Sequence, residues 1–302
     1  MSSHVICAGK RIVCKKDSSS PFIYFSICII CAFGLLANGV VIWLLGFCIK
    51  RNSFTTYILN LSVADFGVLI FLLNMVILIL SELNDDVYLH FPSYIGYICT
   101  GLFLLMQSTG QLLLTAISID RCVAVLFPLW HQCHRPPYCS TTVCTTLWVL
   151  SFLLCGVHII LVRAVGFKYF FLLHPFVINA LLCLPLMIIS SLILFIKVYL
   201  KSQQHKRGRV FGAILLSLLF FLIFSFPINA LFIIDAIYAT QLCLLEYGLM
   251  SASLNSSINP VIYFLLGRHK GSRCRESLKV ILQRVFKEEE DPREEQEPSH
   301  QI

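Results

Sequence analysis

The sequence predicts an all-α membrane protein, a bundle of seven transmembrane helices with a short amphipathic eighth helix on the cytoplasmic face. The chain has 302 residues, of which 58% are hydrophobic and 13% are charged, whereas about 25% of the residues of a soluble domain are charged. The mean hydropathy is +0.82. A helix needs about 20 mostly apolar residues to cross a membrane. Seven runs of this kind fill most of the chain: 22–48, 54–81, 94–126, 139–162, 172–200, 210–239 and 242–266.

The positions of the basic residues indicate how the chain is oriented. The formal net charge is +7, and most Lys and Arg residues lie in every second connection between the runs and in the segment after residue 266. Lys and Arg accumulate on the cytoplasmic side of membrane proteins. We therefore expect an extracellular amino terminus and a cytoplasmic carboxyl terminus. The positive charge reflects topology, so membrane lipids are expected neighbours and nucleic acid is not an expected partner.

Four segments follow from this pattern. Residues 1–21 form a polar extracellular arm, and residues 22–266 form the seven-helix domain. In residues 267–287, apolar residues recur at helical spacing among basic ones, which is typical of a helix lying on the inner leaflet. Cys274 in this segment is a candidate for palmitoylation. Residues 288–302 are acidic, and we expect them to be a disordered cytoplasmic tail.

Polar residues inside the first, second and seventh runs predict a buried polar site. Asn38 is a lone amide in the first run, and Asp65 is an ionisable group well inside the second. Charged groups in membrane helices are costly, so each needs a partner or an ion. The seventh run concentrates polar side chains that have to face the bundle interior. These are Asn255, Ser256 and Asn259, with Pro260 and Tyr263 following.

The end of the third run carries the second candidate site. The segment from Ile95 to Ile119 contains no charge, and Asp120 and Arg121 then follow directly. A charge at the centre of a membrane helix costs about 2.5 to 3.5 kcal/mol, so this pair should lie at the membrane edge or face the protein interior. We interpret it as a cytoplasmic switch. Earlier in the same run, Gln107 and Gln111 are one turn apart and should both face the bundle.

The fourth to sixth runs add a central Trp148 and two prolines. Pro185 and Pro227 each remove a backbone hydrogen bond, which makes a hinge that membrane helices tolerate. The connection between the fifth and sixth runs, 201–209, is short and basic, and leaves no room for an inserted domain.

These motifs resemble those of rhodopsin-like G-protein-coupled receptors. The general matches are Asn38, Leu61 to Asp65, Asp120-Arg121 with Cys122 in place of the usual Tyr, Trp148, Pro185, Pro227, and Asn259-Pro260-x-x-Tyr263. A narrower resemblance to the Mas-related receptors rests on Ala116 to Cys122, on Trp130-His131-x-Cys133-His134-Arg135-Pro136 and on Asn255 to Pro260.

The resemblance implies a plasma-membrane receptor that captures a heterotrimeric G protein when helix six swings outward. Arg121, released from Asp120, would contact the G protein, with Leu129 packing beside it and Tyr263 rotating inward. The hinge of helix six would comprise Phe221, Ser225 and Pro227. Helix six begins with Lys206-Arg207 and offers no acid to Arg121, so Asp120 has to hold it alone and raised basal activity is expected.

The resemblance also implies two binding sites. A sodium ion would bind Asp65 with Asn255, Ser256 and Asn259, where Gly110 takes the place of the usual helix-three contributor. The extracellular ligand would be a peptide or a cationic small molecule, bound in a pocket with Phe103 and Gln107. Phe103 stands where amine receptors carry an Asp, which disfavours a monoamine. Asp235 and Glu246 would anchor a positive group, unless they are solvated surface acids.

Other function classes fit less well. The sequence has no Gly-rich phosphate loop, metal-ligand pair or Ser/His/Asp set, so we do not expect an enzyme. The main alternative is a multi-pass transporter or channel, because polar residues in the middle of the membrane can line a path. The lack of an internal repeat and the charged pair at one helix end favour the receptor.

Overall fold

The computed structural model of the protein describes most of the predicted membrane runs. The described residues are 5–7, 10–12, 20–84, 93–134, 136, 138–165, 179–200, 216, 219, 223, 245–267 and 279–280.

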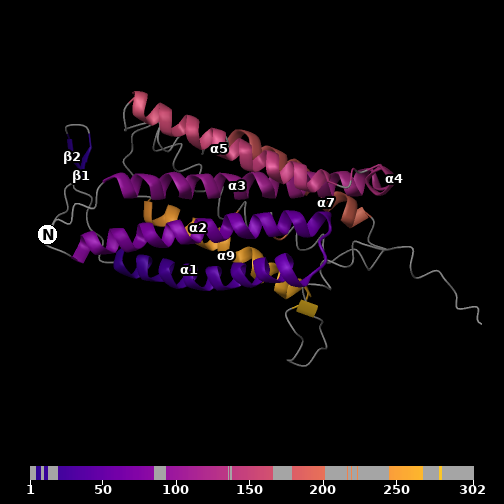
Figure 1. Cartoon of the computed structure of the whole chain (residues 1–302), viewed down its shortest axis with the longest axis horizontal. Coiled ribbons are helices and arrows are strands. Elements are labelled where there is room, and N and C mark those ends of the chain that lie inside the picture. Colours follow the sequence, from indigo (N-terminus) through magenta and orange to yellow (C-terminus); the bar gives the residue numbers. More distant parts are fainter. Residues whose placement is uncertain are drawn as a thin grey trace, which may run out of the picture.

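Long helices in an elongated bundle dominate this part of the chain (Figure 1). The first is continued by a π-helical turn, and another π-helical turn precedes α7. The helical elements are α1 (Ser20–Trp43), η1 (Leu44–Cys48), α2 (Ser53–Asn84), α3 (Ser93–Leu126), α4 (Pro128–Cys133), α5 (Cys139–Val165), η2 (Asn179–Cys183), α7 (Leu184–Leu200) and α9 (Leu245–Gly267).

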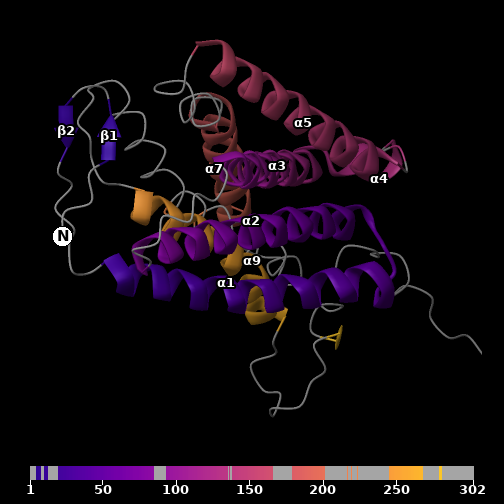
Figure 2. The ribbon, with the colours of Figure 1, turned by 60° about the vertical axis from the view of Figure 1, so that its left-hand side comes forward.

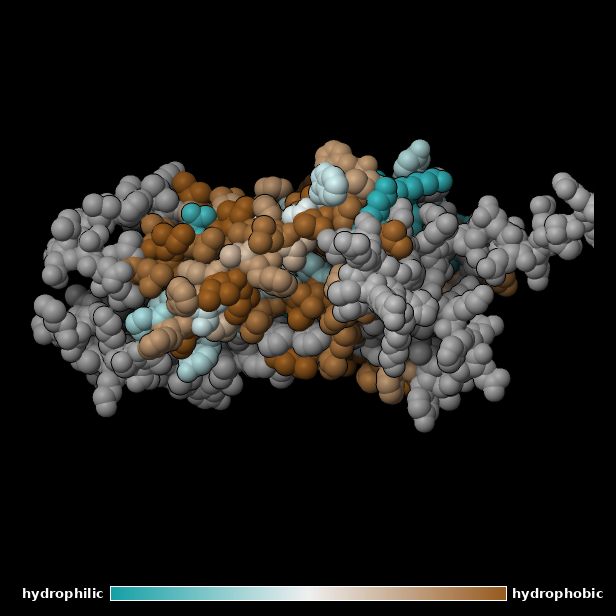
Figure 3. Space-filling model, turned by 90° about the horizontal axis from the view of Figure 1, so that it is seen from below, coloured by the Kyte–Doolittle hydropathy of each residue, from teal (hydrophilic) through white to brown (hydrophobic). Residues whose placement is uncertain are grey.

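The described helices confirm the predicted membrane fold class. Four are long and apolar enough to cross a membrane, at Pro21–Cys48, Ser53–Leu80, Ile98–Leu126 and Cys139–Val157, and Leu181–Ile196 is a shorter apolar helix. Large apolar side chains face outward, and they cover the middle of the face shown in Figure 3. An apolar belt of this kind suits lipid rather than water. In the predicted sixth run, 210–239, only residues 216, 219 and 223 are described, and all three are helical.

Helix α3 lies in the middle of the bundle. It packs against α2, α5 and α7, while α1 packs against α2 and α9; Figures 1 and 2 show α2 between α1 and α3. The arm at the amino terminus and the short helix α4 lie at opposite ends of this bundle (Figure 1). The two ends can therefore carry different functions.

Two apolar clusters form the core. One includes Phe54, Leu113 and Tyr263, towards the α4 end, and the other includes Ile27 and Leu72, towards the amino-terminal end. Buried polar side chains of α1, α2 and α9 separate the two clusters in sequence. The core is thus interrupted by a polar layer.

The amino-terminal arm contains two strands that the sequence did not predict. Strands β1 (Val5–Cys7) and β2 (Lys10–Ile12) pair antiparallel, with Val5 opposite Ile12. Three-residue strands are too short to produce a period that stands out from a polar arm. The first helix begins at Ser20, slightly before the predicted residue 22, and Pro21 occupies its first turn, where a missing N–H costs nothing.

Pro185, where a bend was predicted, is the second residue of α7 and follows directly on the π-helical turn η2. A proline has no N–H to complete the regular hydrogen-bond ladder, so the preceding turn departs from α geometry. Pro260 lies inside α9. Pro227 lies outside the described residues. So do Cys274 and nearly all of the expected helix at 267–287, of which only Lys279 and Val280 are described, as helical residues.

Close approach between α1 and α9 depends on Gly34. A Cβ atom at this position would overlap the Ser257 side chain and the Leu69 Cδ1 atom. The Ser257 hydroxyl group donates to the carbonyl oxygen of Ile30 at 3.3 Å, so it is held where the new atom would lie.

We expect Gly34→Ala to destabilise the bundle by about 1 to 3 kcal/mol, because overpacking forces apart two helices that touch. Gly156→Ala in α5 is the matched control, since no described residue lies within 4 Å of its Cβ position and alanine favours a helix. Thermal unfolding midpoints in detergent measure both variants. Equal midpoints for the two variants would contradict the predicted close approach.

Candidate functional site

The polar layer between the two apolar clusters is the first candidate site. It brings together Asn38 of α1, Asp65 of α2, and three residues of α9. All five side chains are buried, as the sequence predicted for this group; the α9 members are Asn255, Ser256 and Asn259. Helical periodicity explains this, because residues three or four positions apart share one face of α9.

Hydrogen bonds join the three helices through this layer. The Asn259 amide nitrogen donates to Asp65 Oδ2 at 2.8 Å. The Asn38 amide nitrogen donates to the carbonyl oxygens of Gly34 and Ser256, both at 3.0 Å. The Asn38–Gly34 bond lies within α1, whereas the bonds to Ser256 and from Asn259 tie α1 and α2 to α9.

The layer also contains oxygen atoms that can still accept a hydrogen bond or bind a cation. Within the described residues, Asn38 Oδ1 is buried and makes no hydrogen bond, and the buried Ser256 Oγ accepts none, while the Ser256 hydroxyl group lies beside the Asp65 carboxyl group and interacts with it. Gly110 of α3 lies against the same carboxyl group, and a Cβ there would be 3.8 Å from Asp65 Oδ1. Helix α3 therefore offers no side chain at this point, as expected. A buried carboxylate with unused neutral oxygens suits a small hard cation.

The ion pair at the end of α3 is the second candidate site. An Arg121 guanidinium nitrogen lies 3.0 Å from Asp120 Oδ2, and the two side chains are 3% and 13% exposed. This pair lies at the α4 end of the bundle, away from the amino-terminal arm (Figure 1). Leu129 on α4 is 77% exposed at the same end. Asp120, Arg121 and Leu129 therefore lie at the same end of the bundle, with the guanidinium group buried in the protein.

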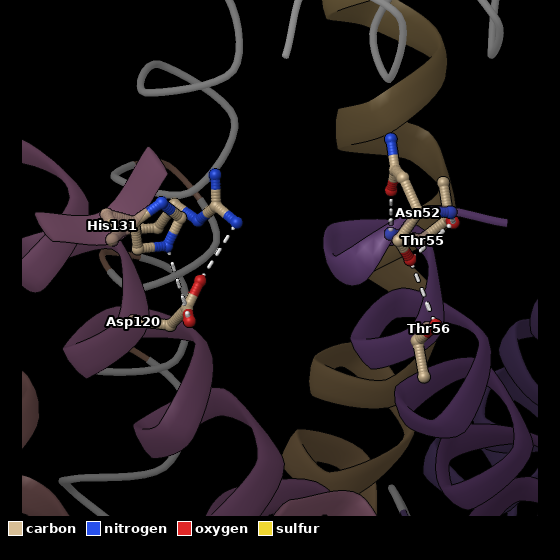
Figure 4. Close-up of polar contacts among 6 residues, drawn as sticks. Asn52, Thr55, Thr56, Asp120 and His131 are labelled. Carbon is tan, nitrogen blue, oxygen red and sulfur yellow. Dashed lines mark hydrogen bonds and ion pairs between the residues drawn. The ribbon is translucent and has the colours of Figure 1, made fainter. Parts of the chain in front are cut away.

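Two residues that the sequence analysis did not assign to the switch also contact it. His131 Nε2 on α4 lies 3.8 Å from Asp120 Oδ1 (Figure 4). The Arg121 guanidinium carbon lies 4.5 Å from the centre of the Phe54 ring. The expectation that Asp120 holds Arg121 alone was therefore wrong. His131 belongs to a motif that carried the family resemblance, whereas Phe54 had no signal beyond its place in an apolar run.

The sequence analysis also did not predict a polar contact between α3 and α7. The Ser190 hydroxyl group donates to Ser118 Oγ at 2.8 Å, and the Cys122 thiol donates to the Ser190 carbonyl oxygen at 3.0 Å. Ser118 and Cys122 are one helical turn apart. Small polar residues with this spacing are common at helix contacts in membranes, but the partner helix cannot be read from the spacing.

The residues predicted for ligand binding are only partly described. Phe103 packs against the apolar cluster that contains Tyr24 and Leu249, and Tyr24 is hydrogen-bonded to Glu246 in the first turn of α9. Phe103 and Glu246 therefore belong to one region near the amino-terminal end. Gln107 is half-buried on α3, and Gln111 is buried as expected for the shared inward face. Asp235 and the predicted hinge residues lie outside the described residues: Phe221, Ser225 and Pro227.

Pro260 and Tyr263 are both buried, and Tyr263 belongs to the apolar cluster near the α4 end.

Trp148, predicted at the centre of its helix, donates from its indole nitrogen to Asn60 Oδ1 at 3.0 Å. This bond ties α5 to α2.

Comparison with known proteins identifies the group to which these features belong. The family model described as "7 transmembrane receptor (rhodopsin family)" matches residues 37–263. This range includes the sixth predicted helix and both candidate sites.

Individual relatives narrow the group. The chain is 35% identical to the proto-oncogene Mas of Rattus norvegicus over 283 residues, which cover 90% of this chain and 86% of the relative. It is 37% identical to the Mas-related G-protein coupled receptor member H of Rattus norvegicus, with 91% and 86% covered. It is 36% identical to member D of the same species, with 90% of each chain covered.

These matches decide between the receptor and the transporter or channel that the polar residues alone left open. The chain belongs to the rhodopsin family of seven-transmembrane receptors, within its Mas-related group, and it is therefore a multi-pass membrane receptor and not an enzyme.

Proposed function

We propose that this receptor binds an extracellular peptide or cationic small molecule and activates a heterotrimeric G protein. The observation that carries the proposal is the buried Asp120–Arg121 ion pair at the end of the central helix α3. A buried arginine needs a compensating partner such as this carboxylate, and its charged group can contact another protein when the pair opens. The amino terminus is extracellular in this proposal, and the α4 end faces the cytoplasm.

The switch works by redistributing a two-state equilibrium. In the resting state Asp120 keeps the Arg121 guanidinium group inside the bundle. In the active state the guanidinium group turns outward to meet the G protein, and the exposed Leu129 packs against the same partner. A ligand that binds the active state about 100-fold more tightly shifts this equilibrium by about 2.7 kcal/mol. That energy is comparable to a few hydrogen bonds.

The ligand binds at the opposite end, close to Glu246. This carboxyl group is hydrogen-bonded to Tyr24, so it links the first turn of α9 to α1 beside the cluster that Phe103 joins. A positive ligand group that pairs with Glu246 would compete with this link. Such a ligand would then alter how α1 and α9 pack. We propose Asp235 and Gln107 as further contacts of the ligand.

The polar layer connects the two ends by holding a sodium ion. Asp65 is the charged ligand, and Ser256, Asn255, Asn259 and Asn38 supply neutral oxygens. Asn38 Oδ1, which makes no hydrogen bond with a described residue, and the Ser256 hydroxyl group beside the Asp65 carboxyl group support this assignment. The ion would neutralise the buried carboxylate and so stabilise the packing of α2 against α9.

Arg121→Ala should abolish ligand-independent and ligand-driven G-protein activation, because the guanidinium group makes the contact. Asp120→Asn should raise basal activation roughly 5-fold, since about 1 kcal/mol of ion-pair energy changes a two-state ratio by that factor. Activation of each G-protein class, normalised to surface expression, measures both effects. Ile119→Ala is the control, because Ile119 is adjacent but faces outward. If Arg121→Ala signals like the unmodified receptor, the proposed function is wrong.

Sodium should raise the thermal unfolding midpoint of the purified receptor by about 2 to 4 °C relative to an equal concentration of choline, since an ion that binds the folded state stabilises it. Asp65→Asn should remove the difference between the two salts. Asn74→Ala is the matched control, because Asn74 is also polar and within a membrane span, and its amide nitrogen donates to the Ile70 carbonyl oxygen of its own helix. A sodium effect that survives Asp65→Asn would place the ion elsewhere.

Glu246→Gln should weaken activation by basic peptides about 10-fold while leaving activation by uncharged agonists unchanged, because one ion pair is lost. A library of basic peptides tested for half-maximal signalling gives the measurement. Tyr24→Phe should have a smaller effect, and Tyr247→Phe, whose side chain is exposed, serves as its control. Equal losses for charged and uncharged agonists would show that Glu246 has a structural role only.

A further inference from the structure

The second partner of Arg121 is an aromatic ring on α2. The guanidinium carbon lies 4.5 Å from the centre of the Phe54 ring, well within the roughly 6 Å over which a cation is attracted to the face of an aromatic ring. Arg121 is 3% exposed and Phe54 is 1% exposed. Because water does not separate the two groups, their attraction is at the strong end of the range for such pairs.

The start of α2 fixes the backbone position from which this ring projects. The Thr55 backbone nitrogen donates to Asn52 Oδ1 at 2.7 Å, and the Asn52 backbone nitrogen donates to Thr55 Oγ1 at 2.7 Å. The Thr56 hydroxyl group also donates to the Asn52 carbonyl oxygen at 2.9 Å (Figure 4). This reciprocal cap fixes the first turn of the helix. Phe54 lies inside the capped turn, so the backbone that carries its ring is fixed relative to the start of α2.

We propose that Phe54 is a positioning residue of the switch, and that its ring holds Arg121 in the resting state together with Asp120. Phe54 lies on α2 whereas Asp120 lies on α3, so the ring provides a restraint from a different helix. The attraction to the ring is lost when the guanidinium group turns outward. Phe54 therefore lowers basal signalling without touching the G protein. This inference rests on the proposed function of Arg121.

Packing alone could also explain a buried ring, because Phe54 belongs to the apolar cluster with Leu113 and Tyr263. The two roles respond differently to the charge distribution of the ring. Fluorine atoms withdraw the negative potential from the ring face and hardly change its shape, whereas packing depends on shape. A fluorinated series at position 54 therefore separates attraction from packing.

The experiment introduces monofluoro-, difluoro- and trifluorophenylalanine at position 54 of the full chain by nonsense suppression in cells. Basal G-protein activation is measured per receptor at the surface. We expect a stepwise increase that reaches about 3- to 5-fold for the trifluoro ring, since the resting state loses its attraction to the cation in steps. The same series at Phe66, on the same helix and half-buried, is the control and should be flat.

Natural substitutions provide a second test. Phe54→Tyr keeps an aromatic face and should retain low basal activation, whereas Phe54→Leu keeps an apolar side chain but should raise it. If Phe54→Leu does not reach the surface, the fluorinated series decides the question. A flat series at position 54 alongside increased signalling by Asp120→Asn would overturn the role of Phe54 and leave the switch intact. No response to Asp120→Asn or Arg121→Ala would overturn both proposals.

Discussion

A carboxylate buried in an apolar bundle has to be compensated within the protein, and this constraint organises the middle of the receptor. Asp65 meets it through the amide of Asn259, and Asn38 holds the backbone of the same helix through the carbonyl oxygen of Ser256. Lipid supplies no hydrogen bonds that could replace these contacts. The three helices α1, α2 and α9 are therefore tied together where their side chains are least apolar, and the apolar clusters on either side pack against this junction.

The same constraint explains the position of the charged pair at the end of α3. Arg121 is almost completely buried, which an arginine tolerates only with compensating partners. Asp120 provides a charge, and Phe54 provides an aromatic face. The two partners belong to different helices, so the resting position of the guanidinium group depends on how α2 and α3 are packed.

Helix α3 is well placed to link the two ends of the receptor. Its backbone at Gly110 lies beside Asp65, its Ser118 contacts Ser190 of α7, and its end carries Asp120 and Arg121. A shift of α3 would change the contacts at all of these points. Because interhelical hydrogen bonds and packed side chains exist in discrete arrangements, small changes at one end can favour a different arrangement at the other.

The sequence by itself determined the fold class, the first four membrane spans to within a few residues, and the buried polar residues of α1, α2 and α9, but not the contacts of His131 and Phe54 at the second site. It could do so because hydropathy is a local property and because the family motifs lie within short segments. The tertiary structure decided which side chains meet. Phe54 and Arg121 are 67 positions apart, and Ser118 and Ser190 are also on separate helices. Such contacts depend on the rotation and spacing of packed helices, for which hydropathy carries no information.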